Sequence, residues 1–337
     1  MLRRVQPRPR PAGGELMTAP TVSEEEFIAL FKKFGSPTKV ARYLGISVRN
    51  VHARRDRLSK ILGIDLHTCY KPGGMPIDGA KKDAIRETTI QNGTVLVFSD
   101  AHYFPDIISP AHRALIEMIH RLKPAIIVCN GDAFDGGTIS RFPRIGWESK
   151  PSVKHELAAV TERLDEIEQA VKKIRRGTKL YWPLGNHDAR YETFLAQNAP
   201  QYEGVSGFHL KDKFPNWIPC WALKINDDVV VKHRMKGGVH SGHNNALWSG
   251  RTMVTGHDHM LKITPLVDYN GIRWGVNTGT LATPYGPQFI DYTEGNVTNW
   301  ASGFAVLTFR DGRLMWPELV SVISDNEVCF RGEIIKV

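Results

Sequence analysis

Short runs of apolar residues recur through the middle of the chain, and polar segments follow them. The runs comprise residues 95–98, 126–129, 180–182 and 229–231. Continuous apolar runs of this length are typical of strands that are buried on both faces. In open α/β sheets, the loops after the carboxyl ends of such strands gather the reactive groups. The pattern therefore predicts an α/β fold whose polar segments follow the strand ends.

A longer amphipathic pattern and two turn signals predict the elements around these strands. Residues 153–176 carry apolar side chains at helical spacing, which predicts a long helix packed on the sheet. Residues 263–267 and 271–276 flank an Asn-Gly turn, and residues 304–309 and 313–316 flank an Asp-Gly turn. Both patterns are typical of β-hairpins.

The first quarter of the chain has the pattern of three short helices. Ser23 with Glu26 predicts a capped first helix, Pro37 opens a second that Gly45 ends, and Ser47 caps a third. Their apolar faces comprise Phe27, Leu30, Phe31, Val40, Ala41, Leu44, Val51 and Leu58. A helix, a tight turn with glycine and a second helix rich in arginine resemble a DNA-binding helix-turn-helix over residues 38–51.

Charge is concentrated in this quarter of the chain. Residues 1–92 contain 17 Lys and Arg against 9 Asp and Glu, a net of +8, whereas the whole chain has a net charge of +9. This asymmetry favours contact with nucleic acid over the alternatives, a protein-docking unit or a solvated helix face. The candidates for contact with DNA are Lys39, Arg42, Arg49, Asn50, Arg54 and Arg57.

These signals predict four segments. We expect a disordered basic tail over residues 1–20, a helix-turn-helix domain over 21–64, a linker over 65–92 and an α/β domain over 93–337. The proline-rich start lacks the apolar core of a secretory signal, and no apolar run approaches the ~20 residues of a membrane span. Four widely spaced cysteines favour reduced thiols. We therefore expect a cytoplasmic protein without membrane contact.

The polar segments after the strands share one chemistry. They combine carboxylate and amide oxygens with imidazoles in residues 99–102, 131–135, 185–188, 233 and 256–259. This mixture suits Mn, Fe or Zn, which make a bound hydroxide available near neutral pH. Each segment alone is an ordinary loop, so the prediction of a metal site depends on their combination. For the fourth segment, His240 and His243 are alternatives to His233.

In order and spacing, the segments resemble the calcineurin-like metallophosphoesterase superfamily, whose pattern is D-x-H, G-D-x-x-D, G-N-H-D/E, a lone H and G-H-x-H. The resemblance spans roughly residues 93–285 and implies a four-layer αββα sandwich that binds two divalent ions. Carried over by position, the ligands would be Asp100, His102 and His259 for one ion, Asp132 for both, and Asn186, His233 and His257 for the other. Mn²⁺ is the expected metal, with Fe, Zn, Ni and Mg as alternatives.

The resemblance also implies the chemistry. A hydroxide between the two ions would attack phosphorus, His187 would protonate the leaving group and Asp135 would orient His187. Arg141 and Arg144 are candidates for phosphate contact, since Gly136 replaces the arginine of phosphoprotein phosphatases.

Three functions fit these observations. The first is a nuclease-like phosphodiesterase acting on DNA, because the second and third segments resemble the DNA-repair exonuclease branch. The second is a phosphatase or phosphodiesterase of small phosphoesters or nucleotides. The third is a DNA-binding regulator whose phosphoesterase fold does not catalyse. The pairing of a small helix-turn-helix with a compact phosphoesterase resembles proteins of phages and mobile elements.

Overall fold

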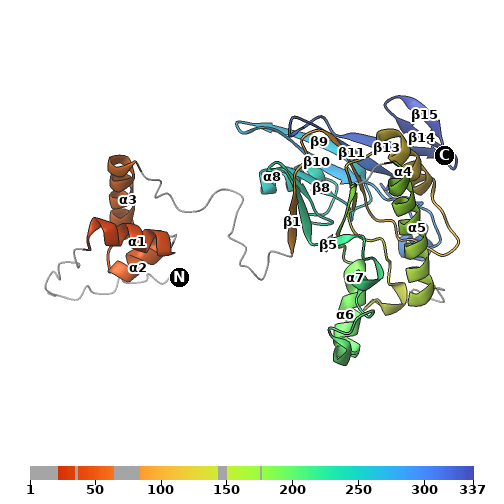
Figure 1. Ribbon diagram of the computed structural model, residues 1–337, viewed down its shortest axis with the longest axis horizontal. Helices are drawn as coiled ribbons and strands as arrows, with labels where there is room; N and C mark the ends of the chain where they lie inside the picture. Colours follow the sequence, from red (N-terminus) through yellow and green to blue (C-terminus); the bar gives the residue numbers. More distant parts are fainter. Residues whose placement is uncertain (1–21, 35–36, 64–83, 143–149, 175–176) are drawn as a thin grey trace, which may run out of the picture. The chain divides into compact units, whose positions relative to one another are not determined.

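The computed structural model describes residues 22–34, 37–63, 84–142, 150–174 and 177–337. The chain divides into two compact units, Met1–Pro76 and Ile77–Val337. The first unit contains helices and the second contains two sheets with their covering helices (Figure 1).

The first unit has the three helices that the sequence predicts. They are α1 (Glu24–Phe34), α2 (Pro37–Leu44) and α3 (Val48–Leu62). The Ser23 hydroxyl accepts from the Glu26 amide at 3.1 Å, and the Glu26 carboxylate accepts from the Ser23 amide, so the capping box forms. Ser47 caps α3 by accepting from the Asn50 amide. The buried core consists of Phe27, Phe31, Val40, Ala41, Leu44, Val51 and Leu58.

The second unit is built on two sheets. One has the strand order β15 (Glu333–Lys336), β14 (Glu327–Phe330), β13 (Glu318–Ser324), β11 (Gly303–Arg310), β2 (Gly93–Phe98), β3 (Ile126–Cys129), β4 (Lys179–Pro183) and β5 (Ile218–Cys220), with β12 (Arg313–Leu314) paired to β11. The other has the order β1 (Ile85–Thr88), β6 (Ala222–Ile225), β7 (Val229–Val231), β8 (Thr252–Thr255), β10 (Gly271–Thr278) and β9 (Leu261–Asp268).

Alternation along the central strands shows how the layers stack. Leu96 and Phe98 of β2 pack with the helices α4 (Pro110–Leu122) and α5 (Val153–Ile174) in one core cluster. Val95 and Val97 of the same strand pack with residues of the second sheet in another cluster. Both faces of this sheet are therefore buried, which explains why its strands are continuous apolar runs.

The fourth layer is helix α8 (Ser241–Ser249), which packs on β8, β9 and β10. A Cβ added to Gly275 of β10 would lie 1.9 Å from the Gly242 carbonyl oxygen, so glycine permits the close approach of helix and strand. The order of layers is helices, sheet, sheet, helix, and the predicted αββα sandwich is confirmed.

Most predicted elements form where the sequence places them. The helix over residues 153–176 is observed as α5, and the hairpin of β9 and β10 pairs Asp268 with Gly271. The strand predicted over residues 313–316 is shorter and ends at Leu314. The remaining helical segments are α6 (Asp188–Asn198), α7 (Leu210–Lys213), α9 (Ile290–Thr293) and two short 3-10 turns at Gly137–Ile139 and Pro200–Tyr202.

The predicted linker over residues 65–92 requires a correction at its end. Residues 85–88 form β1, an edge strand that pairs in parallel with β6. The side chain of Asn226 binds the amide and carbonyl of Ile90, and Lys224 forms an ion pair with Glu87 at 2.9 Å. These contacts place the start of the sheet unit before residue 93. The predicted tail over residues 1–20 and most of the predicted linker lie outside the described residues.

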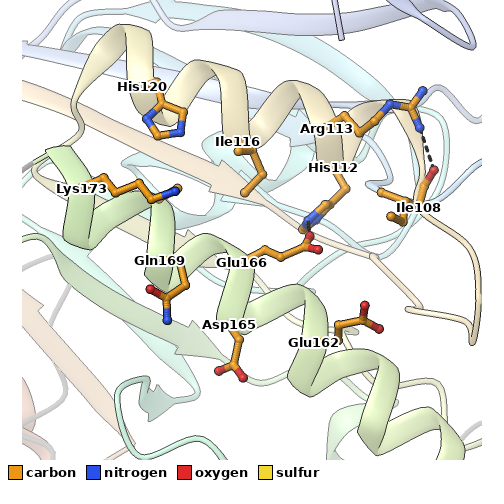
Figure 2. A pocket seen from close by; sticks show the side chains of 11 residues that line it. Ile108, His112, Arg113, Ile116, His120, Glu162, Asp165, Glu166, Gln169 and Lys173 are labelled. Carbon is orange, nitrogen blue, oxygen red and sulfur yellow. Dashed lines mark hydrogen bonds and ion pairs between the residues drawn. The ribbon is translucent and has the colours of Figure 1, made fainter.

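A pocket of about 610 Å³ lies between α4 and α5 (Figure 2). His112 lies at its wall and is held by Glu166 at 2.8 Å and by the Tyr103 hydroxyl at 3.1 Å. Charges of both signs line the pocket, and none of the residues that the sequence singles out for chemistry is among them.

No helix in the described ranges is long and apolar enough to cross a membrane.

Candidate metal centre

Five loops at the strand ends bring the predicted site residues together. The first three loops follow β2, β3 and β4, and the other two follow β7 and β8. Glycine allows the loops to touch. A Cβ on Gly185 would lie 1.9 Å from the Asp132 Oδ1, and one on Gly256 would lie 2.5 Å from the Asp100 Oδ2. Gly185, which precedes Asn186, and Gly256, which precedes His257, are therefore required by the close approach of the loops.

The backbone of the loops is unusual at the predicted ligands. Asp100, His102, Asp132, His257 and His259 all have positive φ, between 37° and 74°. Few residues other than glycine adopt this left-handed conformation, and Asp, Asn and His tolerate it best. Its concentration in one place is typical of functional sites, where the surrounding structure holds the strain.

The structure brings the predicted ligands together in two groups, each of which lies within 4.8 Å between ligand atoms. The first comprises Asp100, His102 and His259, and the second comprises Asp132, His233 and His257. These two groups correspond to the two ions that the resemblance implies, and a third group, His102, Asp135 and His187, shares His102 with the first. His240 is exposed at the start of α8, and neither it nor His243 belongs to a candidate group among the described residues. The geometry therefore favours His233 for the fourth segment.

The orientation of the imidazoles suits metal binding. His102 Nδ1 lies 3.0 Å from Asp135 Oδ1, and His233 Nδ1 lies 2.8 Å from the Asn130 carbonyl oxygen. Such partners fix the tautomer and leave Nε2 available as a ligand. The Nε2 atom of His102 is buried without a hydrogen bond, as are Asn186 Oδ1 and His259 Nδ1, whereas the Nε2 atom of His233 lies 3.0 Å from Asp132 Oδ2. Because unpaired buried polar atoms are costly, this donor set fits divalent ions.

The charges in the site point the same way. Burial alone would lower the pKa of His233, but the carboxylates of Asp132 and Asp100 raise it to about 10. Burial would likewise raise the pKa of Asp132, but His233 and His187 lower it below its usual range. Carboxylates that hold a proton on a buried imidazole so firmly also provide the negative potential that attracts a cation.

His187 lies beside both groups of candidate ligands. Its Nδ1 is 2.8 Å from Asp135 Oδ1, and its Nε2 is 4.0 Å from Asp132 Oδ2. Burial disfavours the charged imidazole, but Asp132 and Asp135 outweigh it and raise the pKa of His187. Its side chain keeps 21% exposure, so the imidazole can be reached from the surface of the site.

Arg190 is a site residue that the sequence analysis missed. It donates to the Asp135 carbonyl oxygen at 2.9 Å, and its Nη2 lies 3.2 Å from His187 Nε2. Arg190 follows His187 by three residues at the start of α6, so helical spacing could have placed it on the same side.

Asp188 is a second missed residue, and it ties two loops together. Its buried carboxylate accepts from the amides of Asp132, Phe134 and Gly185 and from the Trp182 indole, at 2.8–3.1 Å. Burial and the nearby Asp132 raise its pKa to about 6. Its position in the Gly-Asn-His-Asp segment is the sequence feature that could have identified it.

The loop over residues 277–280 supports the first group of ligands. The Thr280 hydroxyl donates to the Asp100 carbonyl at 2.6 Å, and Thr278 Oγ1 lies 2.6 Å from the Ser99 hydroxyl. These contacts hold the loop that carries Asp100.

Glu156 of α5 holds the two glycines that follow Asp135 and should make stability depend on pH. It is 2% exposed and accepts from the amides of Gly136 and Gly137. Burial and the charge of Asp135 raise its pKa from 4.5 to about 7. Between these values the unfolded chain loses the proton while the folded chain keeps it, so stability should fall by about 3 kcal/mol as pH rises through this window.

Glu156→Gln removes this titration but keeps one acceptor oxygen. We expect the variant to gain stability relative to the wild type between about pH 5 and pH 8, as measured by urea unfolding. An identical difference in unfolding free energy at both pH values would contradict the prediction.

The residues predicted to contact phosphate or DNA do not form a single group as the candidate ligands do. Arg141 is exposed and lies over the Phe142 ring at 5.1 Å, whereas Arg144 lies outside the described residues. In the first unit, Lys39, Arg42, Arg49 and Asn50 are exposed.

Two of the candidates for DNA contact are engaged within the first unit. Arg57 forms an ion pair with Glu24, and Arg54 lies over Phe27 and donates to the Val22 carbonyl. Arg54 therefore has a structural role that the charge pattern did not predict.

Comparison with known proteins places this chain in a family. The model of the calcineurin-like phosphoesterases matches residues 93–286. The gene 54 protein of Mycobacterium phage L5 is 31% identical over 233 residues, which cover 63% of this chain and 87% of that protein. The gene 54 protein of Mycobacterium phage D29 is 28% identical over 159 residues, 41% of this chain and 60% of that protein.

Solved structures with similarity include a phosphoesterase from E. coli, Yfce, at 16% identity and a TM-score of 0.30, covering 66% of this chain and 97% of that one. A Pseudomonas putida nuclease, MPE, has 13% identity and a TM-score of 0.29, covering 66% and 86%. Scores this low support no conclusion about substrate. The family match covers more than half of the chain, and the protein is a calcineurin-like phosphoesterase, a metal-dependent hydrolase of phosphoric esters.

Proposed function

We propose that this hydrolase cleaves phosphodiester bonds in DNA. The observation that carries the choice of DNA is the set of exposed basic side chains on α2 and α3, Lys39, Arg42 and Arg49, on a folded helical unit that belongs to the same chain as the metal centre. Basic side chains clustered on a helical unit are the electrostatic signature of nucleic-acid binding, and Asn50 beside them can contact a base edge.

The residues of the metal centre have separate roles in this proposal. Asp100, His102 and His259 would hold one ion, Asn186, His233 and His257 the other, and Asp132 would bridge them. When bound, two divalent ions, with Mn²⁺ suited to the mixed oxygen and imidazole donors, would activate water and neutralise charge on the phosphate. Asp135 holds the imidazoles of His102 and His187 by the same carboxylate oxygen.

His187 is the proposed general acid. A deoxyribose oxygen is a poor leaving group unless it receives a proton. Although burial disfavours the charged imidazole, Asp132 and Asp135 raise the pKa of His187 above its usual value, which favours the protonated form. Asp135 holds the ring through Nδ1. Arg190 Nη2, which can only donate, lies 3.2 Å from Nε2, so Nε2 must take up its proton and turn from Arg190 before it can protonate the leaving oxygen.

The DNA substrate is tested by removing charge from the helical unit. In the triple variant Lys39→Ala, Arg42→Ala, Arg49→Ala, we expect KM for DNA to rise and the slope of log affinity against log salt to become less steep by up to about three, because each lost phosphate contact removes roughly one. The kcat at saturating DNA should hold, since the chemistry lies in the other unit.

A control with the same change in charge is the triple variant Lys172→Ala, Arg313→Ala, Lys336→Ala, whose residues are exposed on the sheet unit. An equal effect in both triple variants would mean that only net charge matters. Hydrolysis of small phosphoesters with no cleavage of DNA would favour the alternative substrate class.

A further inference from the structure

An aromatic cluster borders the first group of candidate ligands. The Phe289 ring lies 5.1 Å from the His102 ring and 5.4 Å from the His259 ring, between centroids. Trp300 lies 4.3 Å from His259, and Tyr292 of α9 lies nearly parallel to Trp300, at 6.2 Å and 17°. The cluster therefore extends from the candidate ligands outward along residues 289–300.

Exposure rises along the cluster. Phe289 is 5% exposed and packs against the imidazoles, whereas Tyr292 is 70% exposed. Phe289 contacts the imidazoles of both His102 and His259, and Trp300 contacts His259 as well. The Tyr292 ring buries little surface among the described residues, so folding does not account for its position.

The segment just before Phe289 also carries an exposed aromatic side chain. Tyr285 is 66% exposed, and Pro287 and Gln288 line a small hollow together with Asp135. Residues 285–300 thus lie against both the candidate ligands and the residue that holds His187. A phosphate in the metal centre would have its adjoining nucleoside next to these side chains.

We propose that Tyr292 and Trp300 form a stacking platform for an unpaired nucleobase beside the scissile phosphate. This proposal rests on the proposed function and narrows its substrate to single-stranded nucleic acid. Aromatic faces stack on any base, which gives affinity without sequence preference. Bases inside a duplex already stack on one another and offer no free face, so the platform selects unpaired strands.

The test compares oligonucleotides with and without a base. Single-stranded DNA is cleaved beside matched strands that carry one abasic site, placed at successive positions along the strand. We expect one position where loss of the base raises KM by about 5- to 150-fold, the effect of one stacked base. Tyr292→Ala should remove this difference, and Tyr292→Phe, which keeps the ring, should retain it.

The matched control is Tyr269→Ala. Tyr269 is fully exposed in the turn between β9 and β10, at the end of that hairpin remote from His259. This variant should retain the dependence on the base. If Tyr292→Ala retains it as well, or if the wild type shows no dependence at any position, the stacking proposal is overturned.

Failure of the proposed function would look different. If no DNA is cleaved, the DNA hydrolase proposal fails, and stacking is judged by fluorescence anisotropy with the same labelled strands. Tighter binding of the base-bearing strand than of the abasic strand, lost in Tyr292→Ala, would support the platform. Equal binding of the two strands by the wild type would overturn it.

Discussion

Replacing His187 by alanine should lower kcat for DNA cleavage by about 10²- to 10⁴-fold, the usual contribution of a positioned general acid. The imidazole is held by Asp135 at 2.8 Å, and the carboxylates around it raise its pKa. Loss of the acid matters most when the leaving group is basic. Cleavage of a p-nitrophenyl diester, whose leaving group departs without a proton, should therefore fall much less than cleavage of DNA.

The comparison of the two leaving groups separates acid catalysis from damage to the metal centre. His240→Ala is the control, because His240 is exposed at the start of α8 and should not affect either substrate. An equal loss with DNA and the nitrophenyl diester, together with a reduced metal content, would contradict the acid role and indicate that His187 supports the ligands.

Asp132→Asn should reduce the binding of the metal ions more than His187→Ala does. Asp132 is 1% exposed, and its Oδ2 lies 3.0 Å from His233 Nε2, while its Oδ1 accepts from the His187 amide at 2.8 Å. An amide cannot bridge two cations as a carboxylate does. We expect kcat to fall by more than about 10³-fold, since stabilisation of charge by the ions is worth several kcal/mol. Metal content per chain, measured by mass spectrometry, should fall as well.

Asp311→Asn is the matched control for this variant. Asp311 has a φ of 49° in the turn between β11 and β12, close to the 55° of Asp132, but it lies outside the candidate groups. Full metal content with low activity in Asp132→Asn would mean that the carboxylate acts in the reaction without holding the ions. Unchanged activity would remove Asp132 from the site.

The sequence contained the parts of the fold that depend on local pattern. The continuous apolar runs of β2 and β3 predicted strands buried on both faces, and Ser23 and Ser47 marked helix starts that the structure confirms. The grouping of the candidate ligands was implied by the resemblance to the calcineurin-like family. The parallel strands β2, β3 and β4 bring three of the ligand segments to one edge of their sheet. Their roles in binding metal remain predictions.

Features that depend on distant partners were not predictable. The strand β1 contains Arg86 and Glu87 and has no apolar run, and it exists because it pairs with β6 more than 130 residues later. Spacing alone did not show that Arg54 would lie over Phe27. The aromatic cluster has the same origin, since residues 289–300 reach His259 only through the folded sheets.

The left-handed backbone at the five candidate ligands has a consequence for how this protein diverges. Each such residue costs the fold about 1 kcal/mol or more, which glycine would avoid. Selection for catalysis keeps the strained residues in place. If that selection is lost, glycine can replace them and remove the strain. Among related chains, glycine at two or more of the positions 100, 102, 132, 257 and 259 should therefore mark lineages that kept the sandwich and abandoned hydrolysis. Asparagine at positions 100 and 132 would mark more recent loss, because it removes the carboxylate charge without relaxing the backbone.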